Sequence, residues 1–185
     1  SVTAQASVDR KTRWTVTLDG CEIAANDVVR APGTFTHEDR RQLQDHATAA
    51  RALAQVGSCE AALRMTADYV TERKQFGRPI GTFQAVTQRL ADAYIDVTAV
   101  RLTAWRAAWL VAAGTPDADA LAVAAWWATD APSRVVESAM HLHGGISVDL
   151  DYPLHRHYLA VKQTELALGG PARRLEALGA GLAVA

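Results

Sequence analysis

The sequence has few cysteines and no long apolar run, and these absences exclude several kinds of protein. Only Cys21 and Cys59 are present, and they lack the spacing of a metal site or a disulfide framework. The longest apolar stretches, residues 109–113 and 121–128, are far shorter than the roughly 20 residues of a membrane span. We therefore expect reduced thiols, no bound metal and no membrane-spanning helix.

Neither sign of charge is in excess. The 19 lysines and arginines and the 20 acidic residues give a formal net charge of −1, so the sequence does not favour nucleic-acid binding. The chain opens at Ser1 with a polar run and without the apolar core of a secretory leader. From these features we expect a cytoplasmic protein.

Alanine is the residue that the chain has in abundance. There are 37 alanines among 185 residues, and apolar residues make up 49% of the chain. Alanine is the strongest helix former because it loses no side-chain entropy in a helix. The composition therefore predicts a mainly α protein that is large and apolar enough to bury a core.

The first 33 residues have a different pattern. Residues 13–18 alternate and are followed by the turn pair Asp19-Gly20, which predicts a strand that returns at residues 21–23. Because two strands alone are not stable in water, we interpret this segment as the end of a larger sheet. The Ala-Pro-Gly run at residues 31–33 ends the pattern and marks a domain boundary.

Helical periodicity governs residues 34–185. We expect Thr36 to cap the first helix, Thr115 and Pro116 to open the third, and Pro132 to kink it. The expected helices cover residues 36–73, 82–114, 115–143, 152–168 and a short segment from 171. Helices of this length with short connections predict an antiparallel four-helix-type bundle.

Two tryptophans, Trp105 and Trp109, lie one turn apart on the second expected helix. We expect them in the core or at a helix–helix interface. A stacking platform for a base is the alternative, and nothing else in the sequence supports it.

The segment directly after the first expected helix is rich in cations. Arg73, Lys74 and Arg78 flank Phe76 and Gly77. Arginine binds phosphate bidentately and glycine lets backbone approach a ligand, so this junction is a candidate site for a phosphate-bearing ligand. The alternative, which composition alone favours, is that the cations only complement the negative end of the helix dipole.

A second candidate ends the third expected helix. His141 and His143 are two residues apart, so their rings point to different faces and a shared metal is not expected. The glycines Gly144 and Gly145 that follow could let a ligand approach the backbone, or they could simply end the helix.

Both candidate segments resemble the C-terminal domain of flavin-dependent acyl-CoA dehydrogenases. The matching runs are Tyr69-Val-Thr-Glu-Arg-Lys-Gln-Phe-Gly-Arg-Pro-Ile-Gly-Thr-Phe-Gln84, then His141-Leu-His-Gly-Gly-Ile146, and then Pro153-Leu-His155. Their order and separation also match, and the resemblance covers about residues 14–180. It implies that residues 1–33 are a remnant of the family's middle β-domain with a linker, and that residues 34–185 are its C-terminal helical bundle.

The resemblance implies a flavoprotein that oxidises an acyl-CoA thioester between its α and β carbons. In this family a glutamate removes the α proton, FAD accepts the hydride, and the C-terminal bundle reaches the FAD of a neighbouring subunit. The residues that the resemblance assigns to FAD are Arg73, Gln75, Phe76, Gln84, His141, Gly144 and Gly145. Among them, His141 stands where the family usually has glutamine.

The sequence departs from the family at the catalytic base. By the resemblance, the usual position of the glutamate is Leu168, and a minority of members place it near Asp45. Neither position holds glutamate, and leucine cannot accept a proton. Glu165, three residues before Leu168, is a weak substitute candidate, as is Asp45.

The sequence also covers little of the family's remaining domains, so we expect a fragment or a shortened subunit that depends on a partner. Heteromeric family members of steroid-degrading actinobacteria carry the base in only one of two subunit types. By this resemblance we predict a non-catalytic subunit that completes a shared FAD site in a homo- or hetero-oligomer acting on acyl-CoA. The alternatives are a catalytic chain that uses Glu165 or Asp45, and a flavin-free oligomerisation module.

Overall fold

The predicted mainly α fold is confirmed. The computed structural model describes residues 1–31 and 33–183. The helices are α1 (His37–Glu72), α2 (Gln84–Ala112), α3 (Ala118–His143), α4 (Leu154–Leu168) and α5 (Pro171–Leu182). Pro32, within the predicted boundary, and residues 184–185, at the end of the predicted bundle, lie outside the described residues. The division into two domains at residue 33 stays a prediction.

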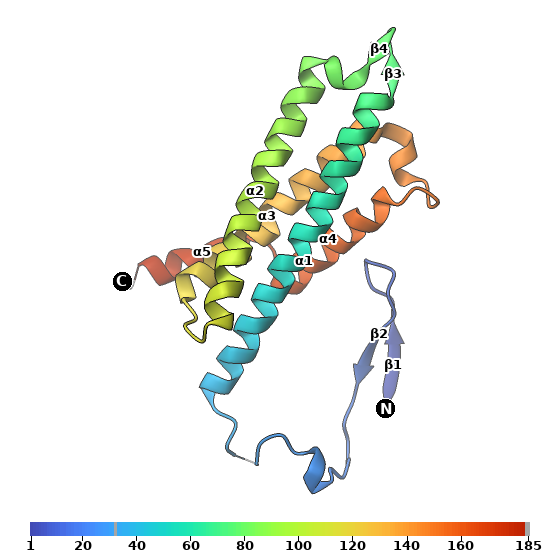
Figure 1. Cartoon of the computed structure of the whole chain (residues 1–185). Coiled ribbons are helices and arrows are strands. Elements are labelled where there is room, and N and C mark those ends of the chain that lie inside the picture. Colours follow the sequence, from blue (N-terminus) through green and yellow to red (C-terminus); the bar gives the residue numbers. More distant parts are fainter. Residues whose placement is uncertain (32, 184–185) are drawn as a thin grey trace.

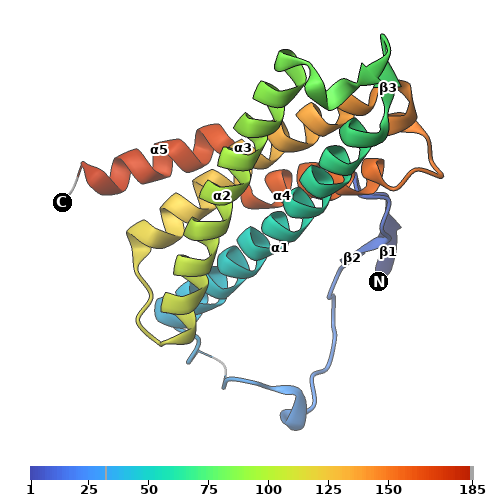
Figure 2. The ribbon, with the colours of Figure 1, turned by 45° about the horizontal axis from the view of Figure 1, so that its top comes forward.

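Helices α1 and α3 form the centre of the bundle (Figure 1). They pack against each other and against both α2 and α4, while α5 packs on α3. In both views α1 and α3 run in the same direction (Figure 2). Their C-terminal ends therefore meet at one end of the bundle.

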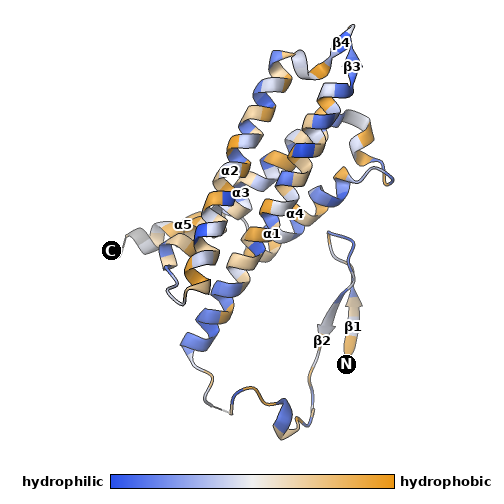
Figure 3. Ribbon diagram, viewed as in Figure 1, coloured by the Kyte–Doolittle hydropathy of each residue, from blue (hydrophilic) through white to orange (hydrophobic). Residues whose placement is uncertain are grey.

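Alanine sets the close spacing of these helices. The alanines with no exposed surface are Ala52, Ala62, Ala104, Ala107, Ala128 and Ala131. A methyl side chain lets neighbouring backbones approach closely while the interior stays densely packed. Polar and apolar residues are interspersed along each helix, as Figure 3 shows, and the buried residues of α1 to α4 are mainly apolar.

A buried glutamine bonds to two neighbouring helices, one of them at the point where a proline removes a backbone hydrogen bond. Pro132 in α3 has no amide N–H, so the carbonyl of Ala128 lacks its usual intrahelical donor. Gln55 of α1 is only 1% exposed, and its Nε2 donates to that carbonyl at 2.9 Å. The same Nε2 lies 3.3 Å from the carbonyl of Val161 on α4. Gln55 therefore supplies the hydrogen bond that the proline removes.

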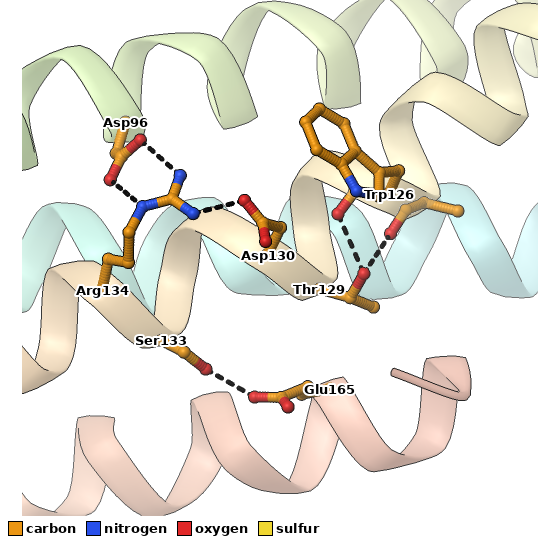
Figure 4. Close-up of polar contacts among 8 residues, drawn as sticks. Asp96, Trp126, Thr129, Asp130, Ser133, Arg134 and Glu165 are labelled. Atoms are coloured by element: carbon orange, nitrogen blue, oxygen red, sulfur yellow. Dashed lines mark hydrogen bonds and ion pairs between the residues drawn. The ribbon is translucent and has the colours of Figure 1, made fainter. Parts of the chain in front are cut away.

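An ion pair on the surface links α2 to α3 (Figure 4). The Arg134 guanidinium donates from Nε and Nη2 to the two carboxylate oxygens of Asp96 at 2.9 and 2.8 Å. Asp130, one turn before Arg134, contacts the same guanidinium. Bidentate geometry of this kind orients both helices, although half-exposed pairs contribute little to stability.

The predicted cap of α1 is confirmed. Thr36 Oγ1 accepts from the amide N–H of Asp39 at 3.1 Å, and the Asp39 carboxylate accepts from the amide N–H of Thr36 at 2.8 Å. This reciprocal pair is a capping box that satisfies two otherwise free amides.

The predicted start of α3 is wrong. The N-cap is Asp117 rather than Thr115, because the Asp117 carboxylate accepts from the amides of Asp119 at 2.9 Å and Ala120 at 3.0 Å. The amide of Thr115 donates instead to the carbonyl of Leu110 at 3.0 Å. Thr115 is thus held in the turn that ends α2 and cannot open the next helix.

The predicted return strand at residues 21–23 is also wrong. Strand β2 (Arg13–Val16) pairs antiparallel with β1 (Val2–Gln5), in the register Val2 opposite Val16. The Ser1 ammonium donates to the carbonyl of Thr17 at 2.8 Å, which extends this pairing. The partner strand of β2 therefore lies before it in the sequence, at residues 2–5, and not after it, at residues 21–23.

One face of α2 is apolar and exposed. The side chains on it are Tyr94, Ile95, Leu102, Trp105 and Trp109, which are 59–67% exposed. Neither tryptophan lies in the core of this chain. Their predicted placement in the core is therefore wrong, while the helix–helix interface and the stacking platform stay predictions.

A buried histidine anchors the end of α3. His143 is 4% exposed and stacks on Tyr69 of α1, with the ring centroids 4.3 Å apart. Its Nδ1 donates to the carbonyl of Ala139 at 2.8 Å, while its buried Nε2 has no partner among the described residues. Burial lowers the pKa of His143, so the neutral ring is the form that fits here.

The Gln55→Leu variant should be less stable by about 1–3 kcal/mol, because it leaves the Ala128 carbonyl buried without a donor. In a Pro132→Ala background the loss should be smaller, since the new amide at position 132 can satisfy that carbonyl. Urea unfolding of the two single variants and the double variant measures this coupling. The exposed Gln42→Leu on the same helix is the control, and equal losses in both backgrounds would contradict the assignment.

Acid should destabilise the protein through His143. The pKa of His143 is lowered in the folded state from about 6.5, so the folded chain binds fewer protons than the unfolded chain. Stability should be full above pH 6.5 and fall as the pH decreases through the folded pKa. His143→Phe should reduce this slope, measured by urea unfolding between about pH 7 and pH 5. Half-buried His157, whose pKa burial also lowers, keeps the slope from vanishing; exposed His37→Phe is the control.

Candidate functional site

The predicted cation-rich junction is a short hairpin beyond α1. Strands β3 (Lys74–Gln75) and β4 (Arg78–Pro79) pair antiparallel, and Phe76 and Gly77 form the turn between them. Both turn residues have positive φ, 53° at Phe76 and 80° at Gly77, which is the geometry of a tight hairpin turn. Glycine adopts this conformation freely, but phenylalanine does so at a cost in strain.

The strained turn places an aromatic ring in the open. The Phe76 side chain is 91% exposed and meets Phe83 edge-on, with ring centroids 6.1 Å apart. The guanidinium of Arg78 lies 4.3 Å from the centroid of the Phe83 ring. An aromatic ring that is largely exposed on a strained turn is a candidate for ligand contact, because backbone strain is often retained at binding sites.

Close packing fixes the hairpin on α1. The amide of Ile80 donates to the carbonyl of Arg73 at 2.8 Å. A Cβ at Gly81 would lie 3.1 Å from the carbonyl oxygen of Val70 on α1, so only glycine fits there without a shift. The 3₁₀ turn η2 (Ile80–Thr82) then leads directly into α2, with Gln84 exposed as its first residue.

The end of α3 forms the second part of this region. His141 is exposed in the last turn, and η3 (Gly144–Val148) follows. Gly144 has a φ of +65°, and no atom lies within 4 Å of a Cβ added at Gly144 or Gly145. The space beside these two glycines is open, so a ligand can approach their backbone.

The two parts meet in one hollow. A cavity of about 270 Å³ is lined by Gln75, Phe76, Ile80, Phe83, Val86, His141 and Leu142. Three of the predicted FAD residues, Gln75, Phe76 and His141, are thus brought together from segments far apart in the sequence. Arg73, Gln84, Gly144 and Gly145 do not line it, although each is close in sequence to a residue that does. The residue assignments to FAD stay predictions.

Sequence reasoning did not assign Ile80 and Phe83 to this hollow. Both lie inside the run that carries the family resemblance, so the signal was present. Their apolar character alone did not separate them from core residues.

The cations of the hairpin are free to meet an anion. Arg73, Lys74 and Arg78 pair with no carboxylate in the described part of the chain. They follow the C-terminal end of α1 directly, so they also offset the negative end of that helix dipole. Both readings left open by the sequence are therefore compatible with the geometry.

The candidate base positions lie elsewhere. Leu168 is 1% exposed, and it lines a groove of about 670 Å³ together with half-buried Asp45. Glu165 does not line this groove. Its carboxylate accepts from Ser133 Oγ at 2.5 Å (Figure 4) and lies 3.6 Å from Lys162 Nζ.

No metal-type cluster of histidine, cysteine and carboxylate groups occurs in residues 1–31 and 33–183. Within the same residues, no helix combines the length and the apolar character needed to cross a membrane. Cys21 and Cys59 are both free, and burial raises the pKa of the Cys59 thiol to about 12.

Comparison with known proteins identifies the family. The profile described as "Acyl-CoA dehydrogenase, C-terminal domain" matches residues 42–182. Acyl-CoA dehydrogenase FadE27 of Mycobacterium tuberculosis is 49% identical over an alignment of 145 residues, and the match covers 74% of this chain and 39% of FadE27.

Solved structures give the same result. The ChsE4-ChsE5 complex from Mycobacterium tuberculosis matches with a TM-score of 0.89 and 44% identity, over 99% of this chain and 49% of that one. The Tcur3481-Tcur3483 steroid ACAD G363A variant matches with a TM-score of 0.86 and 41% identity, over 99% and 48%. PigA with FAD and proline matches with a TM-score of 0.69 and 26% identity, over 79% and 37%.

The chain spans less than half the length of each of these relatives. The match nevertheless covers most of the described bundle, including the hairpin and the end of α3. The chain therefore belongs to the acyl-CoA dehydrogenase family, and its match is to that family's C-terminal helical domain.

Proposed function

We propose that this chain completes a FAD site at a subunit interface of an assembled acyl-CoA dehydrogenase and contributes no catalytic base. The observation that carries the proposal is the hollow that joins Gln75 and Phe76 to His141, beside unpaired cations. The assembled enzyme would desaturate an acyl-CoA thioester between its α and β carbons.

The residues at this end of the bundle fit a dinucleotide. The Arg73 guanidinium suits a pyrophosphate, because its N–H groups can donate to two oxygens at once. The exposed ring of Phe76 suits stacking on adenine, and the open backbone at Gly144 and Gly145 allows close approach. Bound FAD supplies the hydride acceptor of the reaction.

The proposed FAD site needs a second subunit to enclose the rest of the cofactor. Every proposed contact lies on the outer surface of the hairpin or of the α3 end, so this chain encloses only part of a cofactor. The apolar face of α2 is exposed in this chain, and contiguous exposed apolar surface of this kind supports association. The ChsE4-ChsE5 relative is a complex of two different proteins, and we propose a similar hetero-oligomer here.

The side chain at the family's base position supports the proposal that this chain contributes no base. Leu168 is buried, and a hydrocarbon side chain cannot accept the α proton. The partner subunit would then supply the base. A steroid-derived acyl-CoA is the substrate class that the steroid ACAD relative suggests.

Asp45 supports a second candidate function. It lies in the same groove as Leu168, so a catalytic chain with Asp45 as base is the alternative that has a geometric argument. Glu165 has none, because Ser133 and Lys162 hold its carboxylate between α3 and α4. A flavin-free oligomerisation module is the third candidate, and a colourless assembled complex would favour it.

Arg73→Ala should weaken FAD binding by the assembled complex by about 10- to 100-fold, the value of one charge-assisted bidentate contact. The ratio of absorbance at the flavin and protein maxima, followed by a FAD titration, measures the loss. Arg64→Ala on the exposed face of the same helix is the matched control. Unchanged flavin content in a folded Arg73 variant would exclude this residue from the site.

Asp45→Asn should leave turnover of the assembled enzyme within about two-fold of wild type if the partner carries the base. A loss of about 100-fold or more, the usual contribution of a general base, would instead make Asp45 catalytic. Glu165→Gln tested in parallel separates the two weak candidates. Stopped-flow reduction of the flavin by substrate is the measurement, because it isolates the chemical step.

A further inference from the structure

Four arginines line the groove that contains Leu168. Arg41 and Arg51 come from α1, and Arg173 and Arg174 come from the first turn of α5. Asp45 is the only acidic side chain among the lining residues. The groove has a volume of about 670 Å³, which is enough for a small ligand or one end of a larger one.

Three of these guanidinium groups have no counter-ion. Arg41 pairs with Glu38 at 2.9 Å, but Arg51, Arg173 and Arg174 pair with no carboxylate of the described residues. A surface cluster of like charges without partners is unfavourable unless something neutralises it.

The two arginines of α5 line the groove next to the end of α4. Arg174 Nε donates to the carbonyl of Leu168 at 2.5 Å. The Arg173 side chain crosses Gly169, where its Cδ and Nη1 lie 3.5 and 4.0 Å from the position of an added Cβ. Both cations are thus placed directly beside the residue at the family's base position.

The arginines of the groove repel one another electrostatically. Burial, together with the positive charges of Arg173 and Arg51, lowers the pKa of Arg174. In addition, α5 has no acidic residue in its first turn and no side-chain cap, so its positive dipole end adds to the arginines. The first turn of a helix usually favours acidic residues, but the first turn of α5 holds two arginines.

The groove is distant from the hairpin. Arg51 and Arg73 are 22 residues apart on one continuous helix, which corresponds to about 33 Å. The arginine-lined groove and the hollow at the hairpin therefore lie toward opposite ends of α1.

We propose that the groove binds a small anionic group, a carboxylate or a phosphate, held between Arg51, Arg173 and Arg174. Where the family places a carboxylate that removes a proton, this chain presents guanidinium groups that hold a negative charge. The site is independent of the proposed FAD contacts, because it shares no residue with the hollow at the hairpin.

Titration of the full chain with inorganic phosphate and, separately, with acetate tests the proposal. Ionic strength is held constant with chloride, and binding is followed by calorimetry and by the unfolding temperature. We expect at least one of the two anions to bind more tightly than chloride and to raise the unfolding temperature. Preference for phosphate or for acetate then identifies which group the site takes. Binding of neither above the chloride background would overturn the proposal.

Two variants locate the site. Arg51→Gln and Arg173→Gln should each weaken anion binding by about ten-fold or more, since each removes one charged donor of the set. Arg64→Gln, outside the groove, should bind like wild type. Equal binding by all three variants would overturn the assignment to this groove.

A further readout does not depend on the ligand. In chloride buffer, Arg173→Gln should leave the unfolding midpoint unchanged or raise it, because it relieves repulsion within the cluster. A clear loss of stability there would mean that Arg173 is a structural residue, which would also overturn the proposal.

Discussion

The close parallel packing of α1 and α3 is the constraint on which the rest of the structure depends. Buried alanines on both helices allow the approach, and the Gln55 amide bonds to the Ala128 carbonyl that Pro132 leaves free. The proline by itself would leave a buried carbonyl unsatisfied in the middle of the bundle. The Gln55 side chain of α1 reaches this carbonyl, and so removes the cost, only in the register that α1 and α3 adopt here.

That register determines what lies at each end. Since α1 and α3 point the same way, the hairpin that follows α1 meets the turn that follows α3, and the hollow between Phe76 and His141 results. At the other end, residues 41–51 of α1, the start of α3, the end of α4 and the start of α5 line the arginine-rich groove. One packing arrangement therefore produces two regions of different chemistry, one aromatic and cationic, the other cationic around a buried leucine.

The arginine-lined groove is also relevant to how cofactor binding and proton removal could be distributed between different subunits. Under the proposed function, a subunit with leucine at the family's base position would not need a groove complementary to a reacting thioester. Arginines without counter-ions make it complementary to negative charge instead. The hairpin keeps Arg73 and the exposed Phe76, so under the proposed function cofactor contact and proton removal would be separate properties of this fold.

The sequence by itself determined the helices, the cap at Thr36 and the family, because these depend on local periodicity, local hydrogen bonds and contiguous motifs. It placed the cap of α3 at Thr115 rather than Asp117, and a strand at residues 21–23 rather than 2–5. In both cases two nearby segments could form the same hydrogen bonds. Local propensity does not determine which of the two segments forms them. The meeting of Gln75 with His141, the placement of Glu165 against Ser133, and the convergence of Arg51 with Arg173 were decided only by tertiary structure. Such contacts join residues far apart in the chain, and their distances follow from helix packing rather than from spacing in the sequence.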